Sequence, residues 1–166
     1  FGLLDFGACE TLSFKGVQRL AQLLVTLINA DAAAAEQSLS SMLALQRSDS
    51  QSVGDFFDEV VPNLIYLAAP LRSAEPFDFE RWSLDPKINH GLMQKINRLQ
   101  NKQKDSTETR AKEMGLEEFD YALVRVFIDR FTIVLLHCAH LKAKISVQDD
   151  FFKALDAVNV SRPKLV

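Results

Sequence analysis

The residues best suited to chemistry stand at the start of the chain, in the run Phe1-Gly2-Leu3-Leu4-Asp5-Phe6-Gly7-Ala8. An apolar run that ends in an aspartate is typical of a short buried strand that presents one carboxylate at its end. Such a carboxylate can bind a magnesium ion that bridges nucleotide phosphates, and the glycine after it lets the backbone turn. We therefore predict a metal ligand at Asp5 and a nucleotide site at Asp5, Phe6 and Gly7. The competing interpretation is a simple turn, because a tripeptide recurs by chance in unrelated proteins.

A second group of potential metal ligands is formed by His137, Cys138 and His140. On a helix the two histidines share one face, so both imidazoles can reach one ion. The sequence has no HExxH spacing and no evident third ligand, so ordinary helix positions are the favoured interpretation. Cys9 and Cys138 lie far apart and lack ligand spacing, which predicts two reduced thiols.

Charged and aromatic residues elsewhere favour structural roles. Asp129 and Arg130 interrupt an apolar segment, where a structural ion pair is favoured over catalysis. Phe77, Phe79 and Trp82 crowd an irregular stretch, where aromatic side chains more often anchor a core than face a partner or a lipid. The net charge of −3, with acids and bases intermixed, argues against a nucleic-acid partner.

Helices must position these residues, because apolar side chains recur at helical spacing through most of the chain. Pro62 is expected to kink or split the helix that contains it. The pattern predicts helices at 14–29, from the Asp31 cap to about 45, from the capping box Ser52-Val53-Gly54-Asp55 to about 65, from Asp85-Pro86 to 99, from Glu117 to Ala143, and from Ser146 onward. The apolar residues predicted to face inward are Ala35, Leu39, Met42 and Leu43 in the second helix, Phe56, Phe57, Val60, Val61, Leu64 and Ile65 in the third, and Phe119, Leu123, Val126, Phe127, Ile133, Val134 and Leu141 in the long helix.

The segments between these helices are of two kinds. The stretch 70–86 is predicted to be an irregular but structured loop, because its aromatic side chains need a place to bury. The stretch 100–115 has lost apolar periodicity and is predicted to be an exposed polar loop. In the long helix Phe131–Leu136 is apolar, but the charged residues before it leave no run of about 20 apolar residues, so no transmembrane segment is predicted.

Length and composition predict one helical domain over 1–160 and a tail at 161–166, because 166 residues with 48% hydrophobic content suffice for a core. The fold class is mostly α, with a strand stub at Phe1–Leu4. No second convincing strand follows that could pair with this stub. The chain also begins with Phe and not with Met. Both observations predict a fragment whose strand partners lie upstream.

Three stretches resemble the atypical kinase-like family known as AarF/UbiB/ADCK, whose members are linked to ubiquinone biosynthesis in bacteria and mitochondria. Leu3-Leu4-Asp5-Phe6-Gly7-Ala8 is similar to that family's metal-binding strand end, which leads directly into a helix and has no long activation segment. Glu75-Pro76-Phe77-Asp78-Phe79 resembles a loop found at a similar distance downstream. The tail from Tyr121 through Leu141-Lys142-Ala143-Lys144 to Phe151-Phe152 resembles the family's closing helices.

The resemblance implies the helical C-terminal lobe of a protein-kinase-like fold, beginning just before the metal-binding aspartate. It implies ATP and Mg²⁺ as cofactors of the intact parent, with Asp5 as the metal ligand and Asp5, Phe6 and Gly7 beside the nucleotide. The implied activity is ATP hydrolysis or phosphoryl transfer linked to ubiquinone biosynthesis. The implied partners are quinone-pathway lipids or enzymes, and the implied location is intracellular, in the bacterial cytoplasm, at the inner-membrane periphery or in the mitochondrion.

The family's nucleotide lobe, strand lysine and catalytic loop would precede Phe1, so we expect no catalytic residue within this chain. Phosphoryl transfer needs several groups that position the nucleotide and the metal together. The chain alone is therefore expected neither to bind ATP tightly nor to hydrolyse it. Two alternatives stay open, namely a non-catalytic α-helical interaction or scaffold domain and an inactive pseudokinase paralogue.

Overall fold

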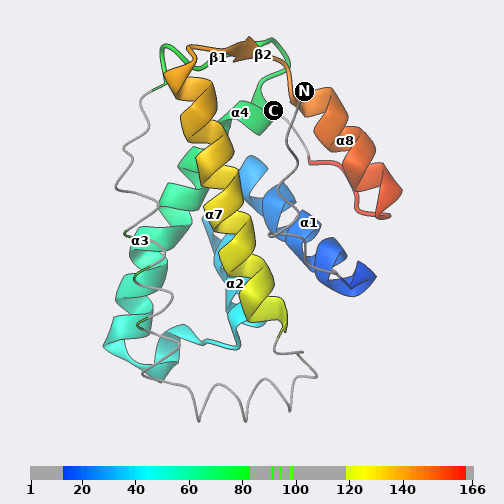
Figure 1. Cartoon of the computed structure of the whole chain (residues 1–166). Helices are drawn as coiled ribbons and strands as arrows, with labels where there is room; N and C mark the ends of the chain where they lie inside the picture. The colour runs from blue at the N-terminus through cyan, green and yellow to red at the C-terminus, as the bar shows by residue number, and fades with distance from the viewer. Residues whose placement is uncertain (1–12, 83–90, 92–93, 95–97, 99–118, 164–166) are drawn as a thin grey trace.

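The computed structural model describes residues 13–82, 91, 94, 98 and 119–163. Between 119 and 126 it describes the backbone and, among the side chains, that of Val124 alone. This part of the chain is mostly helical, as the sequence predicts (Figure 1). Its elements are α1 (Phe14–Ile28), α2 (Ala32–Leu43), the short 3-10 helix η2 (Arg47–Asp49), α3 (Gln51–Leu67), α4 (Ala69–Arg72), β1 (Phe77–Asp78), α7 (Phe119–His140), β2 (Lys144–Ile145) and α8 (Gln148–Ala157).

Side-chain caps fix the first three long helices. The hydroxyl of Ser13 accepts a hydrogen bond from the amide of Gly16 at 3.0 Å, and α1 begins at the next residue. The carboxylate of Asp31 accepts one from the amide of Ala34 at 3.0 Å and starts α2, as predicted. These oxygens satisfy amides that have no partner within the helix.

The start of α3 differs from the prediction. Ser50 and not Ser52 is the N-cap, and its hydroxyl accepts a hydrogen bond from the amide of Val53 at 3.3 Å. The preceding η2 explains the shift, because it delivers Ser50 in an extended conformation ahead of the helix. The reciprocal cap that the sequence suggests at 52–55 occurs earlier, between Gln46 and Asp49.

Pro62 was expected to kink or split its helix, but α3 runs unbroken from Gln51 to Leu67. The proline is exposed, so its ring lies on the solvent side of the helix. Water can hydrate the carbonyl that loses its amide partner there, which reduces the cost of an internal proline. The prediction that the helix splits at Pro62 was therefore wrong.

Four helices end on a residue with positive φ that is not glycine: Ala30 (54°), Ala44 (50°), Lys142 (51°) and Asn159 (57°). At each end two amides fold back onto the last turn, as between Leu45 and Ser40, 3.1 Å apart. This is the Schellman pattern, in which glycine is the usual residue at the left-handed position. The helices end where this turn forms, although the sequence offers no glycine to mark it.

The main core is built by α1, α2, α3 and α7. In Figure 1, α7 crosses in front of α2 and lies between α3 and α1. The apolar stripes predicted for α2 and α3 point into this core, which confirms their assignment. Its most buried members include Leu23, Leu27, Leu39, Leu43, Phe56, Phe57, Val60, Leu67, Val124 and Ile128.

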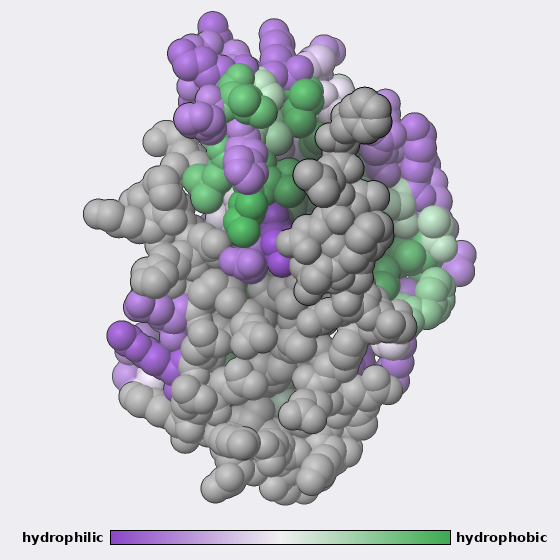
Figure 2. Space-filling model, in the orientation of Figure 1, coloured by the Kyte–Doolittle hydropathy of each residue, from purple (hydrophilic) through white to green (hydrophobic). Residues whose placement is uncertain are grey.

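The inward face of α7 differs from the predicted one. Val134 and Leu141 were expected to face the core but are 57% and 74% exposed. The buried positions are Val124, Ile128 and Leu135, together with Thr132, whose hydroxyl donates to the carbonyl oxygen of Ile128 at 2.7 Å. The run 131–136 is apolar almost throughout, so it carries no polar position that marks the outside. Figure 2 shows apolar side chains exposed among hydrophilic ones in the upper half of the view, where α7 runs.

A small sheet pairs the segment after α4 with the segment after α7, although no second strand was predicted. β1 and β2 pair antiparallel, with Phe77 opposite Ile145 and Asp78 opposite Lys144. The amide of Phe79 donates to the carbonyl of Ala143 at 3.0 Å and extends the pairing. Strands of two residues are too short to show alternation in sequence, which explains why the pattern did not indicate them.

The last helix, α8, packs on α1 and closes a smaller core. Leu155 and Val160 of this region lie against Ala21. The side-chain amide of Gln18 on α1 donates to the carbonyl of Val158 at 2.9 Å, and that of buried Gln148 donates to the carbonyl of Leu71 at 3.4 Å. The prediction of a final helix after Ser146 is confirmed.

Several predicted segments fall outside the described residues: the strand stub at 1–4, the polar loop at 100–115 and the end of the tail at 164–166. Of the helix predicted at 86–99, the described residues Gly91, Gln94 and Arg98 are helical. The long helix ends at His140, before the predicted Ala143. Within the described ranges, no helix combines the length and apolar character that crossing a bilayer requires.

Candidate functional site

The predicted metal and nucleotide residues Asp5, Phe6 and Gly7 lie outside the described residues. The first described element after them is α1, which begins at Phe14 behind its Ser13 cap. The sequence predicts a helix soon after the glycine, and the start of α1 agrees with that expectation. The geometry of the predicted site itself stays a prediction.

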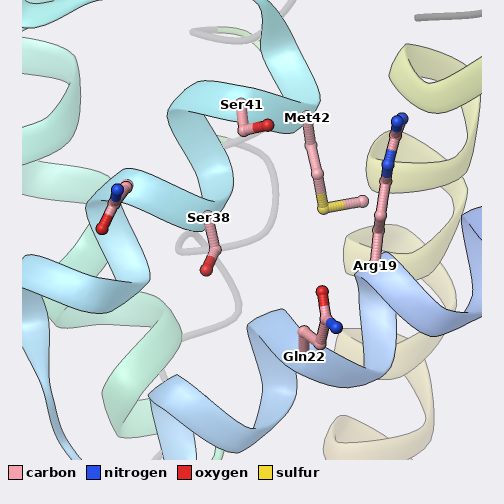
Figure 3. A pocket seen from close by; sticks show the side chains of 6 residues that line it. Arg19, Gln22, Ser38, Ser41 and Met42 are labelled. Atoms are coloured by element: carbon pink, nitrogen blue, oxygen red, sulfur yellow. The ribbon is translucent and has the colours of Figure 1, made fainter. Parts of the chain in front are cut away.

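The described part of the chain contains a groove of about 220 Å³ between α1 and α2. Figure 3 shows Arg19 and Gln22 rising from α1, and Ser38, Ser41 and Met42 standing on α2 across the gap. Gln37 completes the lining. The groove therefore has a mixed lining of polar side chains and the thioether of Met42.

Helical spacing brings these side chains together. Arg19 and Gln22 are three residues apart on α1, and Ser38 and Ser41 are three residues apart on α2, so each pair shares one face. The buried Leu23 and Leu39 follow directly after Gln22 and Ser38 and hold the two helices against each other. The polar pairs consequently line the edge of a packed helix interface.

The charge of the groove comes from Arg19, which is the one ionisable side chain among the six lining residues. The neighbouring acid on α2, Glu36, is engaged by Arg47 at 2.8 Å and 2.6 Å. Arg47 also lies 2.8 Å from Asp58 of α3. The hydrogen bonds that Arg47 donates lower the pKa of Glu36, and their acceptance by Glu36 and Asp58 raises the pKa of Arg47. This acid is thus committed to the contact between α2 and α3.

The lining supplies hydrogen bonds and one positive charge. None of its six residues is an acid or an imidazole, so the lining contains no general base that could activate the hydroxyls of Ser38 and Ser41.

His137 and His140 are exposed in the last turn of α7, and Cys138 is half-buried against the main core. Among the residues that the structure describes, no group of three His, Cys, Asp or Glu side chains is placed to hold a metal ion.

The aromatic residues of the predicted loop pack together and onto the core. Phe79 is 2% exposed, and its ring lies 4.9 Å from that of Phe77 and 5.6 Å from that of Trp82. Tyr66 of α3 stacks on Trp82 at 5.4 Å. The prediction that Phe77, Phe79 and Trp82 anchor this segment to the core is confirmed.

The pair Asp129 and Arg130 does not fit the premise that both charges are buried. Arg130 is exposed and Asp129 is half-buried. Adjacent residues on a helix point about 100° apart, so the same apolar segment can hold one charge near the core and place the next in solvent.

Sequence reasoning missed the residues of the groove. The signal that could have found them is a pair of polar residues at helical spacing beside the apolar stripe on two consecutive helices. That signal is weak, because most surface helices show the same pattern. Only the packing of α1 on α2 decides which of these polar pairs face a common recess.

Comparisons with protein-family models, with curated proteins and with solved structures found no match to this chain.

Proposed function

We propose that the chain is the helical C-terminal lobe of an atypical kinase-like protein of the AarF/UbiB/ADCK type. The observation that carries this proposal is Leu3-Leu4-Asp5-Phe6-Gly7-Ala8 followed closely by a capped helix. The interval between Gly7 and the start of α1 is Ala8–Ser13, which leaves no room for a long activation segment. An abbreviated segment of this kind is what the family resemblance leads one to expect.

A second feature supports the proposal. Glu75-Pro76-Phe77-Asp78-Phe79, the other stretch that resembles the family, lies in an ordered segment, because Phe77 and Asp78 form β1 and Phe79 is buried. The final helices α7 and α8 pack against the helices that follow the motif, as expected of closing helices in one lobe. This consistency favours a lobe over an unstructured linker.

In this proposal Asp5 binds Mg²⁺ and Phe6 and Gly7 lie beside the nucleotide. A carboxylate oxygen is a ligand type that Mg²⁺ prefers, so the donor fits the metal. The metal would neutralise charge on the ATP phosphates when it is bound. The chain contributes one ligand by this assignment, and the parent protein would supply the remaining nucleotide contacts.

The test uses the full-length protein encoded by the gene that contains this chain. Mg²⁺-dependent binding of a fluorescent ATP analogue is expected for the wild type and is expected to fall at least about tenfold in Asp5→Asn, because a charged metal ligand is removed. The matched control is Asp31→Asn, because asparagine caps a helix as well as aspartate does. Equal affinity of wild type and Asp5→Asn for the analogue would contradict the proposal.

A separate expectation concerns the 166-residue chain by itself. One carboxylate does not position ATP for phosphoryl transfer, so the purified chain is expected to show no more ATPase activity than Asp5→Ala. A phosphate-release assay on both proteins checks this. Activity of the wild-type chain clearly above that of the variant would show that the residues needed for hydrolysis lie within it.

The exposed apolar side chains of Val134, Leu141 and Ile145 favour the alternative of a helical interaction domain. Two results together would favour this alternative: the full-length protein binds no nucleotide, and the upstream region of its gene encodes neither a strand lysine nor a catalytic-loop aspartate. Absence of Mg²⁺-dependent binding in a parent that does encode those residues would favour an inactive pseudokinase.

A further inference from the structure

We propose that the outer face of α7, together with the turn and strand that follow it, is a docking surface for an acidic amphipathic helix of another protein. Its apolar centre consists of Val134, Leu141 and Ile145, which we call the outer patch. The proposal rests on described residues at the end of α7 and in β2, so it does not depend on Asp5 or on the kinase-like assignment.

The apolar side chains of the outer patch are exposed to solvent. Val134 is 57% exposed, Leu141 is 74% exposed and Ile145 is 38% exposed. Val134 and Leu141 are seven residues apart, which places them on one face at a separation of two helical turns. The amide of Leu141 still donates to the carbonyl of His137 at 2.9 Å, so the helical path extends to this residue. In Figure 2 apolar side chains gather over the upper part of α7 with hydrophilic residues around them, an arrangement that is typical of interaction sites.

The spacing of apolar residues along α7 favours a helix as the partner. Phe127, Phe131, Val134, Cys138 and Leu141 follow one another at alternating steps of four and three residues, which is the spacing of a seam between two helices. Phe127, Phe131 and Cys138 are half-buried against the main core and form the inner side of this stripe. Val134 and Leu141 form its exposed outer side. A second helix laid along the stripe would bury both, and this line of side chains fits a helix better than the flat surface of a bilayer.

Two cations beside the outer patch favour an acidic partner. Arg130 is exposed one helical turn before Val134, and Lys144 is exposed next to Ile145. Among the ion pairs of the described residues, none involves Arg130 or Lys144. The acid next to Arg130, Asp129, is half-buried and lies about 140° around the helix from Val134. Both cations are therefore available to carboxylates of a partner.

The acids of the adjoining sheet do not cancel this charge. Asp78 lies opposite Lys144 in the pairing of β1 with β2, but its carboxylate is 3.4 Å from the guanidinium of Arg81. The carboxylate of Glu80 lies 2.8 Å from the ammonium group of Lys142. With these two pairs formed, the charge left beside the outer patch is positive. It attracts an acidic helix and repels a basic one, which gives the surface selectivity.

The experiment is a ¹H–¹⁵N titration of the purified 166-residue chain with two designed peptides of about 20 residues, long enough to form helices. Both carry Leu at the a and d positions, with Glu at e and g in the acidic peptide and Lys at e and g in the basic one. Like charges at e and g oppose pairing of each peptide with itself. The acidic peptide is expected to give saturable shifts at 127–145 with a Kd of about 10–100 μM, and the basic peptide is expected to bind at least about tenfold more weakly.

Two variants test the apolar and the charged contributions separately. Leu141→Ser is expected to weaken binding of the acidic peptide about tenfold, because it removes a large apolar side chain from the contact. Phe14→Ser is its control, since Phe14 is also strongly exposed, at 57%, but lies on α1. Lys144→Gln is expected to weaken binding about threefold at low salt, and less at high salt. Its control is Lys15→Gln, which removes the same charge from an exposed position on α1. Both controls are expected to bind like the wild type.

The proposal is overturned if the acidic peptide gives no saturable shifts, if both peptides bind equally, or if each control loses as much affinity as its partner variant. Two further measurements identify a different occupant. Binding to vesicles of phosphatidylcholine and phosphatidylglycerol that Leu141→Ser abolishes, without binding of the acidic peptide, would assign the outer patch to a membrane and overturn the proposal. Dimerisation in sedimentation velocity that Leu141→Ser abolishes, again without binding of the peptide, would assign it to a second copy of the chain and overturn the proposal equally.

Discussion

The left-handed residues at the helix ends show how single positions set the limits of elements. Ala30, Ala44, Lys142 and Asn159 all adopt positive φ, and three of them carry side chains that disfavour it. For a residue with a Cβ this conformation costs about 1–2 kcal/mol, whereas glycine adopts it without strain. Replacement by glycine at the three positions other than Asn159 is therefore expected to relieve backbone strain.

Ala30→Gly tests this backbone strain, because the side chain of Ala30 is exposed and its removal costs no packing. We expect the free energy of unfolding to rise by about 1 kcal/mol and Tm to rise by about 2–4 °C. Urea unfolding followed by circular dichroism measures the change. Ala33→Gly, on the exposed side of α2, is the control and is expected to destabilise the protein. A loss of stability in Ala30→Gly would contradict the assigned strain.

Glu36 is the residue for which a pH effect follows from its contacts. The hydrogen bonds from Arg47 lower its pKa in the folded protein below the value of the free side chain. Because the folded pKa is the lower one, the contribution is complete above the unfolded pKa of about 4.3 and is lost as the pH falls through the folded pKa.

Glu36→Gln is therefore expected to lower the free energy of unfolding by about 0.5 kcal/mol at pH 7, as for a partly exposed ion pair. The difference from wild type is expected to shrink as the pH falls below the unfolded pKa and to vanish only below the folded pKa. Urea titrations at a series of pH values measure both quantities. Glu75→Gln, at an exposed position, is the control, and a difference for Glu36→Gln that persists unchanged at low pH would argue against the ion pair.

At the scale of elements, Arg72 joins the ends of two helices. Its Nη2 donates to the carbonyl of Leu27 in the last turn of α1 at 3.1 Å and to the carbonyl of Ile65 in the last turn of α3. These carbonyls lie at the negative ends of the helix dipoles, where a cation is favourable. Burial lowers the pKa of Arg72, which reflects the cost of keeping this charge away from water.

Arg72→Met is expected to lower the free energy of unfolding by about 1.5–3 kcal/mol, because two carbonyls lose a charged donor. Chemical denaturation measures the loss. The control Arg81→Met removes an exposed arginine and is expected to change stability by no more than about 0.5 kcal/mol. Similar small effects of both substitutions would mean that water replaces the guanidinium at the two helix ends.

At the scale of the whole molecule, the aromatic group Tyr66, Phe77, Phe79 and Trp82 ties the sheet to the helices. Phe79 lies in the main core, and its ring contacts the rings of both Phe77 and Trp82. The pairing of β1 with β2 brings the residues after α7 beside the same group. This aromatic region thus joins the parts of the chain on either side of 83–118, in addition to the packing of α7 in the main core and of α8 on α1.

Phe79→Ala is expected to lower the free energy of unfolding by about 3–5 kcal/mol, because it removes a buried ring and leaves a cavity. The environment of Trp82 should change with it, so tryptophan fluorescence in the folded state reports the local effect. Phe14→Ala, at a side chain that is 57% exposed, is expected to change stability by no more than about 0.5 kcal/mol. Equal losses in the two variants would contradict the central position of Phe79.

The sequence by itself determined the helices whose signals are local. Ser13 and Asp31 mark the starts of α1 and α2, because a capping side chain bonds only to amides of its own first turn. The stripe of Ala35, Leu39 and Met42 determined the buried face of α2, because its period matches the helix. The motif at Asp5 is also a property of sequence alone, and it supplies the functional hypothesis.

Only the tertiary structure decided the features that depend on distant segments. It selected Leu135 over Val134 as a buried residue of α7, because an apolar run lets packing choose the face. It paired Phe77 with Ile145 across a long stretch of sequence, and it set Arg19 opposite Ser38 and Ser41 in one groove. Contacts of this kind arise when elements pack, so no local pattern of residues encodes them.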